Sequence, residues 1–379
     1  MDPSASATVG PIIFPFTGAT VGGSHISTFH LARSLMLDHR IRCIVIAPAA
    51  SSIARQASEM GLEVQATADA PAKSRKPWSD LIRLRRRMQA LRLFGPRTVV
   101  HCNDLWTLES WGLAGRLLSL PVVYHHRVIL TMSRLDRVLI RLAQAVITIS
   151  EPCRRNLGVL ADHRIHFVLN PFPAPTLERP TGWRAEFGAR WHEDRQLVLI
   201  GFVGNFQFRK RPDFFLEVCQ VLAKREPHAR FIIFGRERDY RSKDLEDRAR
   251  ALGIADKVAL AGFRSPTEMN LATLDILLAP ALGEPFGRTL VEALLLGVPF
   301  VATDDGGHSE IVARWSGGYL VRPDATAEQF ADAAVKVLAV SEDVALPLES
   351  RHKVAEELAP RLHAAKILGI YRQIYTASQ

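Results

Sequence analysis

Cysteine is scarce in this chain, and the spacing of the cysteines gives no sign of a zinc site. Only four cysteines occur among 379 residues. They are widely scattered and show no paired spacing of the kind that holds zinc, and few disulfides could form among them. Reduced thiols in a cytoplasmic protein are the simplest interpretation. These residues are Cys43, Cys102, Cys153 and Cys219.

Long apolar runs are also missing. The first residues, Met1–Phe16, contain no basic region followed by a long apolar core, which predicts that there is no signal peptide. No apolar run approaches transmembrane length. We therefore expect a cytoplasmic protein that, where it meets a membrane, lies peripherally on the inner face.

Acidic residues are fewer than basic ones. The chain has 48 Lys and Arg against 39 Asp and Glu, a formal net charge of +9. This balance favours anionic partners, which include nucleotides, nucleic acid and anionic membrane surfaces, without choosing among them. The length predicts two domains, each large enough for its own core.

The start of the chain has the pattern of a doubly wound α/β domain. Residues 11–16 predict a strand, 18–23 form a glycine loop, Ser24 is a candidate helix cap, and 41–47 predict the next strand. Glycines let the backbone approach a ligand closely. From the residues alone, a ligand loop and a plain tight turn both remain open.

The most informative stretch is residues 274–307. Its apolar run 276–279 predicts a strand buried on both faces. The segment 288–296 then predicts a helix, with Gly297 as a left-handed cap, and 299–303 predicts the following strand. Strand, loop, helix and strand again indicate a parallel sheet.

Two acids in this stretch are out of place unless something pairs with them. Glu284 lies in the loop, and Glu292 lies within an apolar helix, where an unpaired carboxylate is costly. One interpretation is a core acid held by an arginine. The other is a pair of acceptors for ligand hydroxyls, beside a phosphate at the amides of Arg288, Thr289 and Leu290.

The segment GEPFGRTLVEALLLGVPFVATDDGGHSEIV closely resembles the donor signature of retaining GT-B-fold glycosyltransferases, the group 1 or mannosyltransferase-like family. Its E-x7-E pair falls on Glu284 and Glu292, and its GG-x-x-E on Gly306, Gly307 and Glu310. The resemblance implies α/β architecture with two Rossmann-like doubly wound domains that face a central cleft. It implies an acceptor domain over 1–172, a nucleotide-sugar donor domain over 173–358, and a helix over 359–379 that returns to the first domain.

The resemblance also carries individual residues. Gly22 and Gly23 match the glycine pair of the family's first loop, and Gly287 opens the donor helix, so the resemblance implies that all three bind the donor. A basic cluster of Arg209, Lys210 and Arg211 follows the strand at 197–203. Cations there would neutralise a leaving diphosphate, although a solvated loop run is the alternative.

One family position is changed in this loop. Lys210 matches the expected lysine, but Asn205 stands where the resemblance expects an arginine. We expect Arg209 or Arg288 to compensate for the missing contact.

A second set of polar residues follows the strand predicted at 122–124. The family often has a histidine here that contacts the donor sugar, and the position falls on Arg127 with His126 one residue before it. Either residue is a candidate catalytic group, and a structural role is the alternative.

The basic segment 73–97 predicts an amphipathic helix. Leu81, Leu84, Met88, Leu91 and Leu93 form its apolar side. It either packs on the sheet with a solvated basic face, or docks on anionic lipid. The two interpretations are compatible.

The resemblance implies a retaining, metal-independent hexosyltransferase that takes a nucleoside-diphosphate sugar as co-substrate and needs no other cofactor. No D-x-D motif is present, which argues against a metal-bridged diphosphate. Glu284 and Lys210 are the principal catalytic candidates. The expected acceptor is a glycan or lipid-linked hydroxyl in polysaccharide or lipopolysaccharide biosynthesis, and nucleic acid is not an expected partner. A nucleotide-sugar epimerase and a non-catalytic polyanion- or membrane-binding protein are the alternatives.

Overall fold

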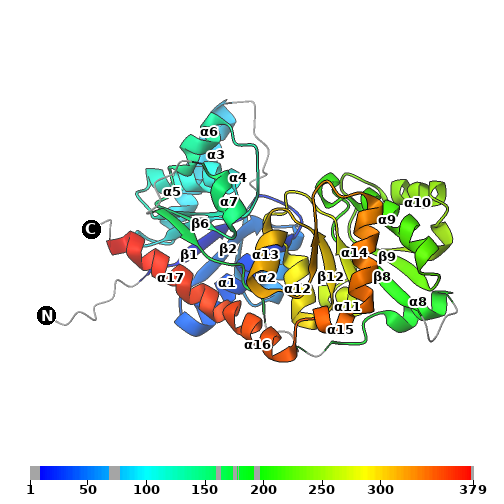
Figure 1. Cartoon of the computed structure of the whole chain (residues 1–379). Helices are drawn as coiled ribbons and strands as arrows, with labels where there is room; N and C mark the ends of the chain where they lie inside the picture. The colour runs from blue at the N-terminus through cyan, green and yellow to red at the C-terminus, as the bar shows by residue number, and fades with distance from the viewer. Residues whose placement is uncertain are drawn as a thin grey trace. The chain divides into compact units, whose positions relative to one another are not determined.

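The chain folds into two compact units. The computed structural model describes residues 9–67, 77–158, 164–173, 177, 179–191 and 197–376. Unit 1 comprises Met1–Pro173 and Glu357–Gln379, and unit 2 comprises Ala174–Glu356. Unit 1 is therefore built from both ends of the chain, and the residues of unit 2 lie between these two segments in the sequence (Figure 1).

Unit 1 has a seven-stranded sheet in the order β3-β2-β1-β4-β5-β6-β7, and every pairing is parallel. Parallel neighbours need crossover connections, and helices supply them here. The strands are β1 Ile12–Pro15, β2 Cys43–Pro48, β3 Glu63–Thr67, β4 Val99–Cys102, β5 Val122–His126, β6 Ala145–Thr148 and β7 Ile165–Phe167. The helices are α1 Gly23–His39, α2 Ser52–Glu59, α3 Pro77–Arg92, α4 Leu105–Thr107, the π-helical η1 Leu108–Gly112, α5 Leu113–Leu117, α6 Arg134–Ile140, α7 Glu151–Asn156 and α17 Pro360–Thr376.

Two apolar clusters cover the faces of this sheet. On one face α1 packs with α17, and the C-terminal side chains Ile367, Leu368 and Tyr371 are buried with Phe14 and Phe29. On the other face Leu91 of α3 and Trp111 of η1 pack on β4 and β5. The last helix of the chain is thus part of the core of unit 1.

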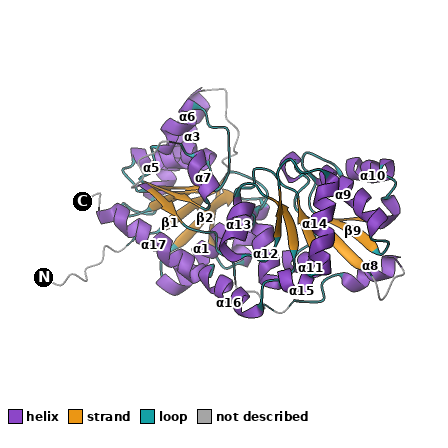
Figure 2. Cartoon of the chain, in the orientation of Figure 1, coloured by secondary structure: helices purple, strands orange, loops and turns teal. Residues whose placement is uncertain are grey.

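Unit 2 has a six-stranded sheet in the order β10-β9-β8-β11-β12-β13, again parallel throughout. Helices pack on both faces (Figure 2). The strands are β8 Val198–Val203, β9 Ala229–Phe234, β10 Val258–Gly262, β11 Ile276–Ala279, β12 Phe300–Thr303 and β13 Tyr319–Val321. The helices are α8 Arg184–Trp191, the 3₁₀ turns η3 Phe208–Lys210 and η4 Ala255–Lys257, α9 Pro212–Arg225, α10 Ser242–Ala251, α11 Thr267–Ala272, α12 Arg288–Leu296, α13 Gly307–Trp315, α14 Ala327–Ala339, α15 Ser341–Val344 and α16 Leu348–Glu357.

These sheets confirm the predicted fold class of two doubly wound α/β domains. Three local predictions were wrong. β5 continues through His126 rather than ending at Tyr124, so His125 and His126 lie within the sheet. Helix α1 takes Gly22, not Ser24, as its cap residue. Leu81 and Leu93 of the predicted apolar face are exposed, since only part of that face packs on unit 1.

No helix among the described residues combines the length and the apolar character needed to cross a bilayer. Residues 73–76 of the predicted basic segment lie outside the described ranges.

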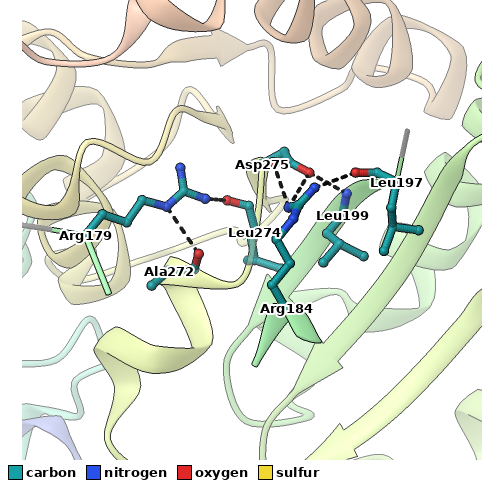
Figure 3. Close-up of polar contacts among 7 residues, drawn as sticks. All are labelled: Arg179, Arg184, Leu197, Leu199, Ala272, Leu274 and Asp275. Atoms are coloured by element: carbon teal, nitrogen blue, oxygen red, sulfur yellow. Dashed lines mark hydrogen bonds and ion pairs between the residues drawn. The ribbon is translucent and has the colours of Figure 1, made fainter. Parts of the chain in front are cut away.

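A polar clasp closes the amino-terminal end of the sheet in unit 2 (Figure 3). Arg184 Nη1 lies 2.9 Å from both carboxylate oxygens of Asp275, and its Nη2 donates to Leu197 O at 2.6 Å. Asp275 Oδ2 also accepts the Leu199 amide at 2.7 Å. Arg179 donates to the carbonyls of Ala272 and Leu274, so both arginines tie the segment before β8 to the segment before β11.

Replacing Asp275 tests this clasp. Asp275→Asn keeps the shape but turns an amide toward Arg184, and we expect it to cost about 2 kcal/mol, since charge-assisted hydrogen bonds are worth roughly 1.5–3 kcal/mol. The side chain of Asp275 is 31% exposed. In a unit of this size the loss should lower the melting temperature by about 4–8 °C.

The matched control is Asp332→Asn. Asp332 pairs with Arg225 on the same unit, but its side chain is 54% exposed. A pair this exposed should contribute less than about 1 kcal/mol. Equal melting temperatures for the two variants would show that the clasp adds nothing beyond a surface ion pair.

Candidate functional site

The candidate site in unit 2 lies at the carboxyl ends of two neighbouring strands. β8 leads into the turn η3, and β11 leads into the loop 280–287. Because β8 and β11 are adjacent and parallel, the segments that follow them meet at one edge of the sheet. The backbone joins them there, since Leu282 N donates to Arg209 O at 2.8 Å.

At this edge Glu284 is held by two cations. Arg209 Nη1 lies 2.7 Å from Glu284 Oε2, and Lys210 Nζ donates to the same oxygen. The Glu284 side chain is only 9% exposed. Burial by itself would raise its pKa, but the charges of Lys210 and Arg209 outweigh burial and hold the pKa well below the usual range. Glu284 is therefore ionised at neutral pH, and the two cations are positioned by it.

The glycine pair after β12, Gly306 and Gly307, contacts the backbone of the loop that carries Glu284. Gly307 N donates to Glu284 O at 2.7 Å, and Asp305 Oδ2 accepts the Gly283 amide at 2.6 Å. Gly306 has φ of 60°, and a Cβ there would lie 2.4 Å from Glu284 O. No residue larger than glycine fits at position 306. The segment that carries Glu284 and the segment that carries Gly306 and Gly307 therefore pack directly against each other.

The helix α12 presents Glu292 and Arg288 together. Arg288 Nη2 lies 3.2 Å from Glu292 Oε1, one helical turn away, and burial raises the pKa of Glu292 while Arg288 opposes the shift. Of the two interpretations of Glu292, the structure therefore adopts the one in which an arginine pairs with the acid. Gly287 begins the helix with φ of 96°, where a Cβ would meet His308 at 2.9 Å.

Leu290 differs from the prediction. Its amide donates to Gly287 O at 3.0 Å, as the first intrahelical bond of α12. It is therefore not available to a phosphate. Thr289 and Arg288 precede it in the first turn, so the helix start offers fewer amide donors than the sequence predicts.

Asn205, which stands where the resemblance expects an arginine, contacts the loop after β9. Its Oδ1 lies 3.4 Å from the Arg236 amide and faces the loop after β9. Arg209, one of the two residues expected to compensate, is already engaged with Glu284. Arg211 lies apart from the pair, with its guanidinium 3.9 Å from the centre of the Phe214 ring.

In unit 1, Gly22 and Gly23 are exposed at the start of α1. Gly22 N donates to His25 Nδ1 at 3.1 Å, and the His25 ring stacks on Phe16 with centroids 4.9 Å apart. Burial and the charge of Arg127 lower the pKa of His25 to about 4. His25 is thus a neutral ring at the glycine loop.

The other two candidates of unit 1 are buried. His126 is hydrogen-bonded with Tyr124 Oη at 2.8 Å and with Asn156 Oδ1 at 3.2 Å, and burial lowers its pKa to about 4. Arg127 donates to Asn170 Oδ1 at 2.7 Å and contacts His125 Nδ1 at 3.0 Å. His126 and Arg127 contact different residues, so their contacts do not bring the two candidates to one site surface. The positions favour a structural role for His126.

Arg127 belongs to a network that sequence reasoning missed. His101 is hydrogen-bonded with Tyr371 Oη at 2.7 Å and with His125 at 3.2 Å. His363 Nδ1 lies 2.7 Å from Leu169 O, and its ring stacks near His125. The sequence signals His125 by its place near a strand end. Nothing in it indicates that His363 and Tyr371, more than two hundred residues later, complete the same cluster.

Comparisons with known proteins bear on both units. A family model described as glycosyl transferases group 1 matches residues 198–340, and one described as glycosyltransferase family 4 matches residues 21–174. Together they cover most of both units. The first includes Glu284, Lys210 and Glu292, and the second includes Gly22 and Arg127.

Characterised relatives match over shorter segments. The lipopolysaccharide core biosynthesis mannosyltransferase LpsB of Rhizobium meliloti is 32% identical over 116 residues, which are 30% of this chain and 33% of that protein. The D-inositol 3-phosphate glycosyltransferase of Corynebacterium urealyticum is 30% identical over 185 residues, 47% of this chain and 43% of that protein. The chain thus spans less than half the length of these curated relatives.

Solved structures match over nearly the whole chain. Anabaena Alr3699/HepE in complex with UDP and glucose aligns with a TM-score of 0.80 at 20% identity, covering 95% of this chain and 99% of that one. The lipopolysaccharide outer core galactosyltransferase WaaB aligns with a TM-score of 0.71 at 16% identity, covering 97% and 99%. At these identities the alignments show that the fold is the same.

The buried histidines of unit 1 make its stability depend on pH. Burial lowers the pKa of His126 to about 4 and of His363 to about 3, and holds those of His101 and His125 well below the usual range. Below about pH 6.5 the unfolded chain binds protons that the folded chain excludes, so stability falls as pH falls. Each such histidine costs about 1.4 kcal/mol per pH unit in that window.

We therefore expect urea unfolding to show a loss of several kcal/mol between pH 7.5 and pH 5.5, and little change above pH 7.5 from these groups. His363→Gln keeps a donor for Leu169 O and should flatten the pH dependence by about one proton. A native chain whose stability is the same at both pH values would contradict the buried neutral network.

Proposed function

Because the chain belongs to the group 1 glycosyltransferases, we propose that it moves a hexose from a nucleoside-diphosphate sugar to a hydroxyl group of a glycan or lipid-linked acceptor. The observation that carries this proposal is the buried Glu284 with Lys210 and Arg209 on one of its oxygens, beside the start of α12. The epimerase and the non-catalytic alternatives receive no support from the matched families and relatives.

Lys210 and Arg209 would stabilise the negative charge of the leaving group. Cleavage of the bond between sugar and diphosphate builds negative charge on the phosphate, and Lys210, Arg209 and the amino end of α12 would stabilise it. Both cations contact Oε2 of Glu284, so Oε1 would accept a hydroxyl of the donor sugar. A fixed carboxylate would also favour the positive charge that develops on the sugar ring.

Glu292 would receive the ribose. Two carboxylate oxygens match two neighbouring hydroxyls, and one of them, Oε1, now contacts Arg288. Donor binding would then release Arg288 from Glu292 and turn it toward the diphosphate. This exchange supplies the phosphate contact that Asn205 cannot make.

We further propose that the reaction retains the configuration at the sugar carbon and proceeds without a metal. Lysine and arginine side chains at Glu284 would supply the positive charge that a metal gives to the D-x-D transferases. Unit 2 would bind the donor, and unit 1 would bind the acceptor.

A thermal-shift titration tests the donor site. UDP, GDP, ADP and their sugars would be added to the native chain and to Glu292→Ala. A nucleotide present at about a hundred times its dissociation constant stabilises the folded state by roughly 2.7 kcal/mol. We expect one nucleotide series to raise the melting temperature of the native chain, and the shift to vanish in the variant.

Glu246→Ala is the matched control, because Glu246 is an exposed glutamate on α10 of the same unit. It should bind the nucleotide as the native chain does. The proposal fails if no nucleotide shifts the native protein, or if the folded Glu292→Ala variant retains the full shift. Polarimetry or NMR of the glycoside formed from the active series would then establish whether configuration is retained.

A further inference from the structure

Helix α3 has more apolar surface than its packing uses. Leu84, Met88 and Leu91, at helical spacing, pack on the core of unit 1. Leu81 continues that stripe toward the start of the helix and Ile82 lies beside it, and both are exposed, although both are large aliphatic side chains. The basic residues Arg85 and Arg86 are exposed on the same outward side. The outward face therefore combines aliphatic and cationic groups.

Helix α6 repeats this combination. Its last residue, Ile140, is buried in the core, while Leu135 and Val138 are 59% and 56% exposed. They are three residues apart, so they share one side of the helix. The exposed arginines of α6 and its end are Arg134, Arg137 and Arg141.

The two helices belong to the same region of unit 1. Both contact η1, and Figure 1 shows α3 and α6 together at the upper end of that unit. We call their outward side chains the α3–α6 surface, which comprises Leu81, Ile82, Arg85, Arg86, Arg134, Leu135, Arg137, Val138 and Arg141. Two acids on these helices are engaged locally: Asp80 lies 3.8 Å from Arg83, and Asp136 accepts hydrogen bonds from Ser133.

We propose that the α3–α6 surface docks on an anionic lipid bilayer, with the aliphatic side chains in the interface and the arginines at the headgroups. Exposed leucine and valine gain free energy by leaving water, and each cation is attracted to an anionic surface. The proposal deepens the proposed function, since it identifies a membrane as the place where a lipid-linked acceptor is met.

The chemistry of the surface favours a bilayer over other occupants. A second copy of the chain would bring arginines against arginines in a symmetric contact, which is repulsive. A nucleic acid would use the arginines but would leave Leu135 and Val138 unused, since they offer nothing to a phosphate. An anionic bilayer satisfies both kinds of side chain.

Vesicle sedimentation tests the proposal on the full chain without any donor sugar. Vesicles of phosphatidylcholine alone would be compared with vesicles that also contain phosphatidylglycerol. We expect binding to the anionic vesicles, weakened by added salt, and little binding to phosphatidylcholine alone. The double variant Leu135→Asp with Val138→Asp should bind at least about tenfold more weakly, because it loses apolar contact and gains like charge.

The matched control is Leu37→Asp on α1 of the same unit, where Leu37 is 62% exposed and lies outside the α3–α6 surface. It should bind vesicles as the native chain does. Melting temperatures and the nucleotide shift would confirm that all variants are folded, so failure of docking and failure of the donor site are distinguished.

Three results would overturn the proposal. The first is equal binding to both kinds of vesicle. The second is an equal loss in the Leu37 control. The third is binding to DNA that the double variant leaves intact while vesicle binding is absent, which would assign the arginines to nucleic acid.

Discussion

The arrangement of the candidate site in unit 2 depends on one electrostatic constraint: a carboxylate removed from water must be given positive partners. Glu284 satisfies it with Lys210 and Arg209, which come from the neighbouring strand. The same requirement fixes the loop after β11, because the carboxylate reaches both cations only if its backbone is held. Gly306, Gly307 and Asp305 hold it from the next strand along. Three strand ends therefore form one rigid structure around a single charge.

The two units solve the problem of buried ionisable groups in opposite ways. In unit 2 the carboxylate remains charged because cations surround it. In unit 1 the histidines around Arg127 are held neutral, because burial and the fixed charge of the guanidinium both oppose a further proton. The first arrangement creates a strong local field, which suits the handling of charged phosphates. The second adds no charge to that of the buried Arg127 and ties β4, β5 and α17 together.

Sequence reasoning succeeded where the signal is local. The strand Ile276–Ala279 and the helix Arg288–Leu296 have the predicted bounds, because buried parallel strands are apolar runs and glycines mark the ends of the helix. It missed the edge strand Glu63–Thr67, whose half-exposed polar residues have no such pattern.

The remaining features depend on contacts that no local pattern encodes. The amide of Leu290 is engaged only because Gly287 has turned into the left-handed region, and the direction of His126 follows from the two extra residue pairs between β5 and β6. The association of His363 and Tyr371 with His101 depends on the return of the chain over a long separation. Such contacts follow from the tertiary structure rather than from spacing.

The composition of unit 1 from both chain ends has a consequence for biosynthesis. Its sheet is complete once about 170 residues have been made, yet Tyr371 and His363, which lie in its core, are made only after the whole of unit 2. Unit 2 is contiguous and can fold while unit 1 still lacks its final helix. During translation the nascent chain therefore carries a sheet with one apolar face only partly covered, a state that favours binding by chaperones.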